Sequence, residues 1–378
     1  MTAPERTSPD RPFVLFVNQG VIGGGAMMGH LAAEHALRLG AATRPDIDAQ
    51  FVRLPEWGLA MRAVAHRAPF ISRWNLDGQV SRWHAAEALR ARRVVRGQLR
   101  HKRPAALHID SHSAAFALTG LMTEIPTFPA VDVPVWEHET VLGRRQFGLG
   151  PSLSMERRVF RRAECVVAYH RWSAEAVLRA CPEATVRVLH PGLDLKKFYP
   201  VRRDHREQRQ ILFVGGEFEA KGGDDLLAAL EPYLGREVVV DAVTSATVPS
   251  RPGLRIHRLG VGDPRLVELY QQADLMCLPS HRDVGPWAIL EALACGTPVV
   301  GSTVGAIPEL LQDSAAGLCV APRDRRQLRA TIESVLFDEP RLQALAGNAR
   351  RMLEADFDAR RQAGKLFDLM QLPTPEVR

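Results

Sequence analysis

Residues 283–300 of the chain read D-V-G-P-W-A-I-L-E-A-L-A-C-G-T-P-V-V. This stretch carries two carboxylates, Asp283 and Glu291, with seven residues between them. A Gly-Pro turn follows Asp283 and leads into an apolar run of helical spacing, so we expect a helix over 286–294. One strand is expected to end near 279 and another to begin near 298. The helix then points its N-terminus at the Asp283 loop, where free N–H groups favour phosphate or sugar oxygens.

The two carboxylates have two interpretations from the residues alone. In one, Asp283 caps a helix and Glu291 lies on its solvated side; in the other, both contact a ligand. The stretch D-x7-E followed by A-L-A-C-G-T-P-V-V resembles the E-x7-E signature of retaining glycosyltransferases of the GT-B fold, family 4 type. Its first half departs from that signature, because Asp283 replaces Glu and Gly285-Pro286 replaces Phe-Gly. Pro286 has no amide N–H, so the substrate contacts that the resemblance implies for Gly285 and Trp287 differ from those of the family.

The composition is that of a globular chain with room for two domains. Its 378 residues exceed one ordinary domain, and 46% are hydrophobic while 24% are charged. No apolar run is long enough to span a bilayer, and the polar first residues carry no export signal. The five cysteines are scattered, odd in number and without a C-x-x-C pair, which is typical of reduced thiols and indicates no structural zinc. We therefore expect a cytoplasmic protein.

Positive charge is concentrated in the first half of the chain. Residues 1–200 hold 27 Lys and Arg against 18 Asp and Glu, and the remainder holds 22 against 25. Between 51 and 103 the counts are 12 and 3, with the densest run from Arg90 to Arg103. A solvated helix face is the ordinary interpretation of such a run. The alternative is attraction to an anionic acceptor or to a membrane surface. Nucleic acid is not an expected partner, since no nucleic-acid-binding motif accompanies the charge.

A strand, a glycine-rich loop and a helix open the first domain. Residues 13–18 are a compact apolar run, Gly24 and Gly25 belong to the loop, and residues 26–39 have helical spacing. In α/β sheets this order admits a ligand near the carboxyl end of the strand, although a tight connecting turn explains the glycines equally well. In the glycosyltransferases that the chain resembles, a glycine-rich loop at this point faces the cleft between the domains.

Two histidines are expected at the carboxyl ends of strands in the first domain. Residues 105–110 and 133–136 read as strands, and His112 and His138 follow them. Each has the alternative of an ordinary hydrogen-bonded loop histidine, which we favour for His112. For His138 the resemblance implies a role, because the family commonly has P-V-V-x-T-x-H here, with its histidine lining the donor-sugar pocket.

A polar linker is expected between the domains, over residues 201–210. Residues 186–200 before it resemble the family's P-N-G-V-D-x-x-x-F-x-P, with His190-Pro191 in place of Pro-Asn. Beyond the linker, residues 211–216 read as the first strand of the second domain and lead into a loop with Lys221. A Lys beside glycines at a helix start suits a diphosphate, although a surface turn with one Lys is common.

The resemblance assigns this Lys to the donor diphosphate. The family pattern G-R-L-x-x-x-K-G occurs at this point, and Lys221 and Gly222 match it. Gly215 and Gly216 open the loop, and Gly216 stands where the family has Arg. One of the two usual phosphate-binding cations is therefore missing or supplied from elsewhere.

Strands and helices alternate through the second domain. Strands over 238–242, 254–257 and 274–279 imply a parallel, doubly wound sheet with right-handed crossovers. After the strand at 299–300, the stretch 301–310 resembles the family's G-G-x-x-E-x-V loop, whose amides cap donor phosphate. Gly305 and Glu309 match that loop.

Three helical segments are expected to close the chain. The first is N-capped by Asp324, the second runs over 339–354, and the third runs over 359–370 and in this fold crosses back to the first domain. The expected division is an acceptor-side domain at 1–203, a nucleotide-sugar domain at 204–355, and a crossing helix at 356–378.

The function implied by the resemblance is transfer of a sugar from a nucleotide-diphosphate sugar to an acceptor hydroxyl, with retention of configuration. Glu291 would hold the ribose, Lys221 the diphosphate, and Asp283 and His138 the transferred sugar. Gly24, Gly25, Gly215, Gly216, Gly222, Gly285, Trp287 and Gly305 would complete the substrate site. No cofactor and no metal are expected. The acceptor is unidentified, with an anionic or lipid-linked molecule as one option; a sugar-nucleotide epimerase or a non-catalytic sensor remain alternatives.

Overall fold

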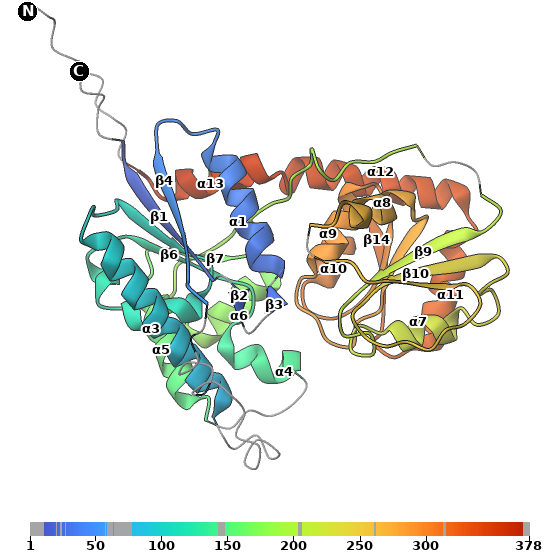
Figure 1. Ribbon diagram of the computed structural model, residues 1–378, viewed down its shortest axis with the longest axis horizontal. Coiled ribbons are helices and arrows are strands. Elements are labelled where there is room, and N and C mark those ends of the chain that lie inside the picture. The colour runs from blue at the N-terminus through green and yellow to red at the C-terminus, as the bar shows by residue number, and fades with distance from the viewer. Residues whose placement is uncertain are drawn as a thin grey trace, which may run out of the picture.

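The computed structural model describes residues 11–19, 21–22, 25–26, 28–56, 58, 63, 78–142, 148–202, 206–260, 262–312 and 315–372. These residues form two α/β lobes side by side, the first drawn in blue and green and the second in yellow and orange (Figure 1). Each lobe is built on a parallel sheet that is flanked by helices. The predicted arrangement of two doubly wound domains is confirmed.

Each sheet has six strands within the described residues. The first has the order β4-β1-β5-β6-β7-β8, with β1 Phe13–Asn18, β4 Asp48–Arg53, β5 Ala106–Ile109, β6 Thr127–Val131, β7 Val166–Ala168 and β8 Val186–Val188. The second has the order β11-β10-β9-β12-β13-β14, with β9 Arg209–Val214, β10 Val238–Val243, β11 Leu254–His257, β12 Leu275–Leu278, β13 Val299–Ser302 and β14 Gly317–Val320. The strand order reverses between β1 and β5 and between β9 and β12. At such points α/β sheets bind ligands, outside the carboxyl ends of the strands.

The helices and the smaller elements connect these strands. The helices are α1 Met28–Ala41, α3 Gln79–Leu99, α4 His138–Leu142, α5 Gly150–Arg162, α6 Arg171–Ala180, α7 Gly223–Ala229, α8 Pro264–Gln272, α9 Trp287–Ala294, α10 Ile307–Leu311, α11 Arg325–Leu336, α12 Glu339–Asp356 and α13 Ala359–Leu369. Segments of 3-10 helix lie at His112–Leu118, Leu121–Thr123 and Val135–Glu137. A short antiparallel pair, β2 Val21–Ile22 and β3 Gly25–Ala26, follows β1.

Strand β1 shows how the sequence builds the first lobe. Its six residues are all buried, as expected for a parallel strand covered on both faces. Side chains alternate between the faces, so Phe16 packs edge-on against Phe367 of α13 while Leu15 joins the cluster that contains Val95 of α3. One layer of helices is therefore α1 with α13, and the other includes α3 and α5.

One predicted strand of the first lobe is wrong. Residues 133–136 do not form a strand; they enter a 3-10 turn at Val135–Glu137, and the strand is β6, Thr127–Val131. Pro129 lies inside this strand opposite Ile109, although a proline is rarely found inside a central strand. The residue at the carboxyl end of this strand is consequently Asp132, and His138 lies further on, as the first residue of α4.

The tail crosses back to the first lobe as predicted, with α12 over the second lobe and α13 beside α1 (Figure 1). Leu193 N donates to Phe357 O at 2.7 Å, and Ala359 N donates to Leu193 O at 3.0 Å, so the two crossings between the lobes run side by side. The predicted cap Asp324 accepts from Gln327 N at 2.8 Å and is confirmed. The boundaries at 203 and 355 stay a prediction.

The basic run lies mainly on helix α3. Arg93, Arg96 and Arg100 are exposed, in agreement with a solvated face. Arg90 departs from that interpretation, because it is buried and donates to Glu87 at 2.7 Å. Much of the stretch from 57 to 77 lies outside the described residues. In the part of the chain that is described, no helix combines the length and apolarity that a membrane crossing needs, and both membrane contact and cytoplasmic location stay predictions.

Candidate functional site

Two of the predicted site residues, Lys221 and Asp283, contact each other at the carboxyl ends of β9 and β12. Lys221 Nζ donates to Asp283 Oδ2 at 2.6 Å, and the two side chains are 27% and 9% exposed. Asp283 is fixed further by the hydroxyl of Ser280 on Oδ2 and by the amide of Val284 on Oδ1, at 3.2 and 2.9 Å. Strands β9 and β12 flank the reversal of strand order, so the ion pair occupies the ligand position of this sheet.

The glycines of the Lys221 loop let the chain pass close to the residues that follow strand β12. Gly222 has φ +78° and N-caps α7, and a Cβ there would lie 2.1 Å from the carbonyl oxygen of Pro279. A Cβ on Gly215 would lie 3.0 Å from the stem of Lys221. Gly216 is less constrained, and its carbonyl accepts from the hydroxyls of Thr244 and Ser245. Gly222 is therefore the position at which a side chain would push Lys221 and Asp283 apart.

A cavity of about 440 Å³ lies between the lobes beside this pair. Lys221, Trp287 and Glu291 line it from the second lobe, and Leu31 and His35 of α1 line it from the first. Tyr270 Oη donates to Glu291 Oε2 at 2.7 Å. Burial raises the pKa of Glu291 to about 7, although the Tyr270 hydrogen bond and nearby Lys197 lower it. The interpretation of Glu291 as a solvated helix residue is therefore wrong.

Asp283 and Glu291 are held apart by the start of α9. Helix α9 begins at Trp287 with Pro286 as N-cap, and Glu291 lies one turn further along. The Trp287 ring packs 5.1 Å from the His190 ring, and a Cβ on Gly29 of α1 would lie 2.9 Å from Trp287 Nε1. Trp287 thus fills the contact between the lobes as well as lining the cavity.

His170 is a site residue whose role the sequence did not predict. Its ring is buried at the start of α6, and Gly285 of the second lobe presses on it, since a Cβ on Gly285 would lie 2.0 Å from His170 Nε2. The other ring nitrogen, Nδ1, lies 3.4 Å from Glu309 Oε1. The contact between the lobes therefore requires a glycine at 285 and uses the histidine at 170.

Glu309 crosses the cleft to cap a helix of the other lobe. Its carboxylate accepts from the amides of Arg171 and Trp172, at 3.1 and 3.3 Å, at the N-terminus of α6. Desolvation raises the pKa of Glu309, but the His170 hydrogen bond and charge and the two amides outweigh it, so the pKa is lowered. The Gly305 turn that precedes Glu309 has φ +54° and packs on the carbonyls of Asp283 and Val284. The loop at 301–310 is thereby joined to both the Asp283 loop and the first lobe.

His138 lies away from strand ends, among other histidines of the first lobe. Its ring is 5.5 Å from the His84 ring, and His84 Nδ1 lies 2.9 Å from Ser152 Oγ. Burial lowers the pKa of His138 to about 4, with nearby His112 adding to the effect. His112, expected to be an ordinary loop histidine, is buried with Nε2 2.9 Å from Glu156 Oε1. The role of His138 stays a prediction.

Asp132 occupies the position that the strand pattern had given to His138. Asp132 lies six positions after Pro126, the spacing from P to H in P-V-V-x-T-x-H, and β6 ends directly before Asp132. Its side chain is 47% exposed, with Oδ1 3.7 Å from His170 Nε2. Sequence reasoning missed it because the strand was placed six residues too late. Of the glycine-rich loop, Gly25 lies in β3, and Gly24 lies outside the described residues.

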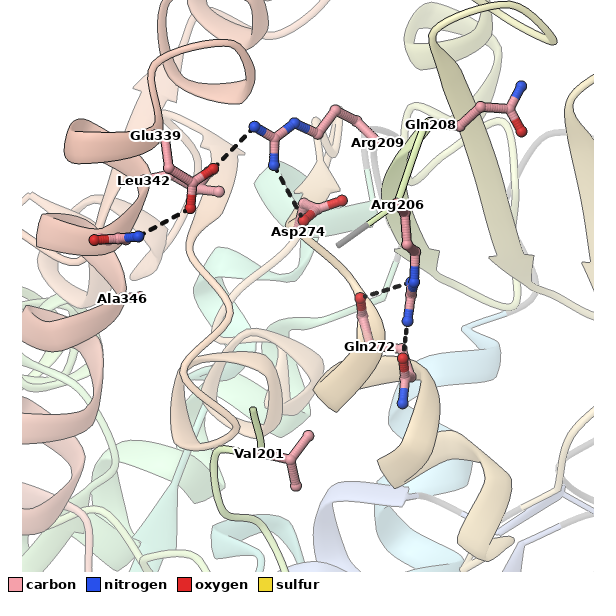
Figure 2. Close-up of a pocket in the computed structure, with 10 residues that line it drawn as sticks. Val201, Arg206, Gln208, Arg209, Gln272, Asp274, Glu339, Leu342 and Ala346 are labelled. Atoms are coloured by element: carbon pink, nitrogen blue, oxygen red, sulfur yellow. Dashed lines mark hydrogen bonds and ion pairs between the residues drawn. The ribbon is translucent and has the colours of Figure 1, made fainter. Parts of the chain in front are cut away.

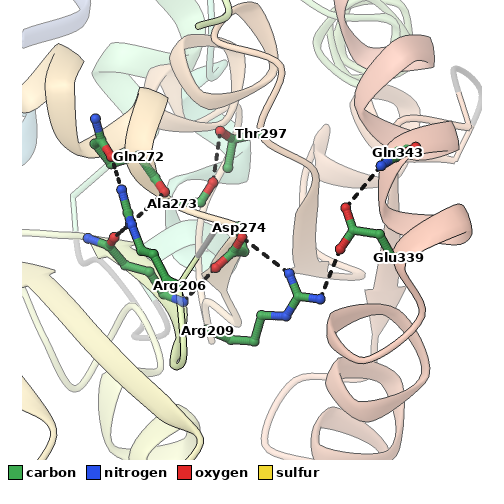
Figure 3. A network of polar contacts seen from close by, with 9 residues as sticks. Arg206, Arg209, Gln272, Ala273, Asp274, Thr297, Glu339 and Gln343 are labelled. Carbon is green, nitrogen blue, oxygen red and sulfur yellow. Dashed lines mark hydrogen bonds and ion pairs between the residues drawn. The ribbon is translucent and has the colours of Figure 1, made fainter. Parts of the chain in front are cut away.

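A second cavity, of about 590 Å³, lies at the opposite end of the second sheet (Figure 2). Arg209 begins β9 and Asp274 precedes β12, so this cavity is at the amino ends of the strands. Arg209 contacts Glu339 at 2.9 Å and Asp274 at 3.6 Å, and Arg206 donates to Gln272 (Figure 3). These contacts tie the linker and α12 to the sheet, so we interpret this cavity as structural.

The second lobe has recognisable sequence relatives. Residues 256–352 match the family model of glycosyl transferases group 1. A D-inositol 3-phosphate glycosyltransferase of Mycolicibacterium smegmatis is 31% identical over 184 residues, which cover 43% of this chain and 42% of that relative. The matched segment thus spans less than half of the relative.

Solved structures match nearly the whole chain. A sucrose-phosphate synthase from Thermosynechococcus elongatus has a TM-score of 0.71 at 17% identity, over 96% of this chain and 98% of its own. Anabaena HepE in complex with UDP-glucose has a TM-score of 0.64 at 15% identity, over 95% of this chain and 100% of its own. The predicted GT-B fold is confirmed.

Proposed function

We propose, from its relation to glycosyl transferases group 1 and its GT-B fold, that this chain is a glycosyltransferase that moves a sugar from a nucleotide-diphosphate sugar to an acceptor hydroxyl. The observation that carries the proposal is the Lys221–Asp283 pair at the reversal of strand order, beside an interdomain cavity lined by Glu291. One sequence relative is named as a glycosyltransferase, and the structural neighbour HepE was solved with UDP-glucose, which supports this class of donor.

The donor would lie along the carboxyl ends of β9 and β12. Its diphosphate would replace the Asp283 carboxylate as the ion-pair partner of Lys221. The Lys221 ammonium group would then neutralise the charge that develops on the leaving group. Glu291, when ionised, would accept hydrogen bonds from both hydroxyls of the ribose. The Asp283 carboxylate would then be free to contact the transferred sugar. Binding of the donor would therefore itself make this carboxylate available.

The acceptor would approach from the first lobe. Closure of the lobes, for which Glu309 provides a link, would exclude water that otherwise hydrolyses the donor. We propose that the reaction retains the anomeric configuration and needs no metal. Proton NMR of the fresh product checks the first proposal, and activity in EDTA checks the second.

The test of the proposed class is the fate of a labelled donor with and without acceptor. A glycosyltransferase releases nucleoside diphosphate and does so faster when an acceptor mixture is present. An epimerase changes the sugar of the donor with no acceptor and releases no nucleotide, and a non-catalytic sensor binds the donor without either change. Either of these last two outcomes contradicts the proposal.

A further inference from the structure

Two carboxylates follow neighbouring strands of the first lobe at their carboxyl ends, Asp110 after β5 and Asp132 after β6. Asp110 is buried, and both of its carboxylate oxygens already have partners. Oδ1 accepts from Tyr169 Oη at 2.7 Å, and Oδ2 lies 2.6 Å from His30 Nδ1. Asp132 has one ionic partner within 4 Å among the described residues, His170, at 3.7 Å, and 47% of its side chain is exposed. Asp132 therefore has free acceptor capacity toward the cleft.

Asp132 faces the Asp283 loop of the second lobe across the same histidine. The Nε2 atom of His170 is the atom that approaches Asp132, and it is also the atom on which Gly285 presses. Gly285 is two residues from Asp283. The Asp132 side chain and the Asp283 loop thus reach the same histidine from opposite lobes, and among the described residues no Lys or Arg of the first lobe lies within 4 Å of Asp132.

Electrostatics agrees with this geometry. Water reaches about half of the Asp132 side chain, yet enclosure by the two lobes raises its pKa by desolvation. His170 and His30 lower the pKa, whereas Asp283 and Asp110 raise it further, and the net shift is upward. An incoming anion would add to an existing repulsion, while a hydroxyl or an amine would give these oxygens a hydrogen-bond donor.

We propose that Asp132 and Asp283 together select the transferred sugar, accepting hydrogen bonds from hydroxyl or amino groups and rejecting donors whose sugar carries a carboxylate. This inference rests on the proposed function and adds to it a substrate class and a specificity residue in the first lobe. It does not rest on the net charge of that half of the chain: Arg93 and Arg96 of α3 are exposed, and Arg90 is paired with Glu87.

The test compares two matched donor pairs by calorimetry. UDP-glucose and UDP-glucuronic acid differ in whether C6 is an alcohol or a carboxylate, and GDP-mannose and GDP-mannuronic acid differ in the same way. The pair to use is the one whose free nucleotide, UDP or GDP, the protein binds. Within that pair, we expect the wild-type protein to bind the neutral nucleotide sugar at least about tenfold more tightly than the nucleotide uronic acid. In Asp132→Asn this preference should fall to about threefold or less, through tighter binding of the uronic acid.

Two controls separate this inference from the proposed function. Binding of free UDP or GDP should be the same in Asp132→Asn as in the wild-type protein, because Asp132 would contact the sugar and no part of the nucleotide. Glu175→Gln removes one negative charge from the exposed side of α6 and should keep the wild-type preference. An unchanged preference in Asp132→Asn with normal nucleotide binding overturns the inference alone. Failure of the wild-type protein to bind any nucleotide or nucleotide sugar overturns the proposed function as well.

Discussion

The ion pair between Lys221 and Asp283 makes a prediction about competition. Because the pair is 2.6 Å long without a donor, a diphosphate has to replace Asp283 on the Lys221 ammonium group. Asp283→Asn removes the competing charge, so we expect free nucleoside diphosphate to bind several-fold more tightly to this variant. The sugar-bearing donor should gain less or bind more weakly, since it loses the Asp283 contact to the sugar. Calorimetry with nucleoside diphosphate and nucleotide sugar measures both.

Glu291→Ala is the matched variant for that experiment. It removes the proposed ribose contact, so it should weaken free nucleotide and nucleotide sugar alike. If Asp283→Asn weakened both ligands equally, Asp283 would be a nucleotide contact and the assignment of the two carboxylates would be exchanged.

Glu291 also predicts a pH dependence. Its pKa is raised to about 7 by burial, so the group is mostly neutral below pH 7 and mostly a carboxylate above it. If the ionised form holds the ribose, affinity for nucleotide sugar should rise between pH 6 and 8 in the wild-type protein. In Glu291→Gln the affinity should be lower and level over this range. A nucleotide sugar is the required ligand, because the terminal phosphate of a free nucleotide itself titrates near about pH 6. A rise of the same size in Glu291→Gln would contradict this role.

Among the elements, the contact of α10 with α6 predicts how the lobes are held. Glu309 accepts from two amides at the α6 N-terminus, across the cleft. Glu309→Ala should free α6 from the loop at 301–310, so we expect a larger radius of gyration in small-angle X-ray scattering and a loss of about tenfold or more in kcat/KM.

Glu175→Ala is the control for that experiment, since Glu175 lies on the same helix with a 70% exposed side chain and a weak pair to Arg179. It should change neither quantity. A compact Glu309→Ala protein with normal turnover would mean that the carboxylate only caps α6.

The elements of the second lobe were largely predictable, and those of the first lobe were less so. The start of α9 follows from Gly285-Pro286, and the Asp324 cap follows from local chemistry, because both signals lie within a few residues of their effect. Strand β6 was not predicted because the runs 127–131 and 133–136 are both apolar and both contain a proline, so the local pattern does not separate them, and pairing with β5 and β7 decides the outcome. Because the strand was predicted too late in the chain, the sequence placed His138 and not Asp132 at its carboxyl end.

For the molecule as a whole, the return of α13 to the first lobe predicts opposite effects of two identical substitutions. A Cβ on Gly40 of α1 would lie 1.9 Å from the Cβ of Ala363, whereas a Cβ on Gly97 of α3 would have nothing within 4 Å. Gly40→Ala should destabilise the fold by about 1–3 kcal/mol through overpacking. Gly97→Ala should stabilise it by up to about 1 kcal/mol, since alanine favours a helix. Urea unfolding measures both; an equal gain for Gly40→Ala would contradict the packing of α13 on α1.

The interdomain part of the site could not be read from the sequence. Lys221, Asp283 and Glu291 are found by motif, because their spacing within one lobe is fixed by local structure. His170 contacts Gly285, Asp132 and Glu309, which lie far from it in the chain. These contacts depend on how the two lobes pack against each other. Net charge is equally uninformative here: the first half is strongly basic, yet the carboxylates of Asp110 and Asp132 follow the carboxyl ends of its strands β5 and β6.

The most direct test of the account is the release of nucleoside diphosphate from a panel of UDP-, GDP- and ADP-sugars, comparing the wild-type protein with Lys221→Ala. Lys221→Ala should keep its fold, since 27% of the side chain is exposed and it pairs with Asp283 in the cleft. We predict that the wild-type protein cleaves the donors of at least one base and that Lys221→Ala is slower by about 100-fold or more, the effect of losing one preorganised charge. No cleavage of any donor, or equal rates for the two proteins, would contradict the assignment of this cleft as a glycosyltransferase site.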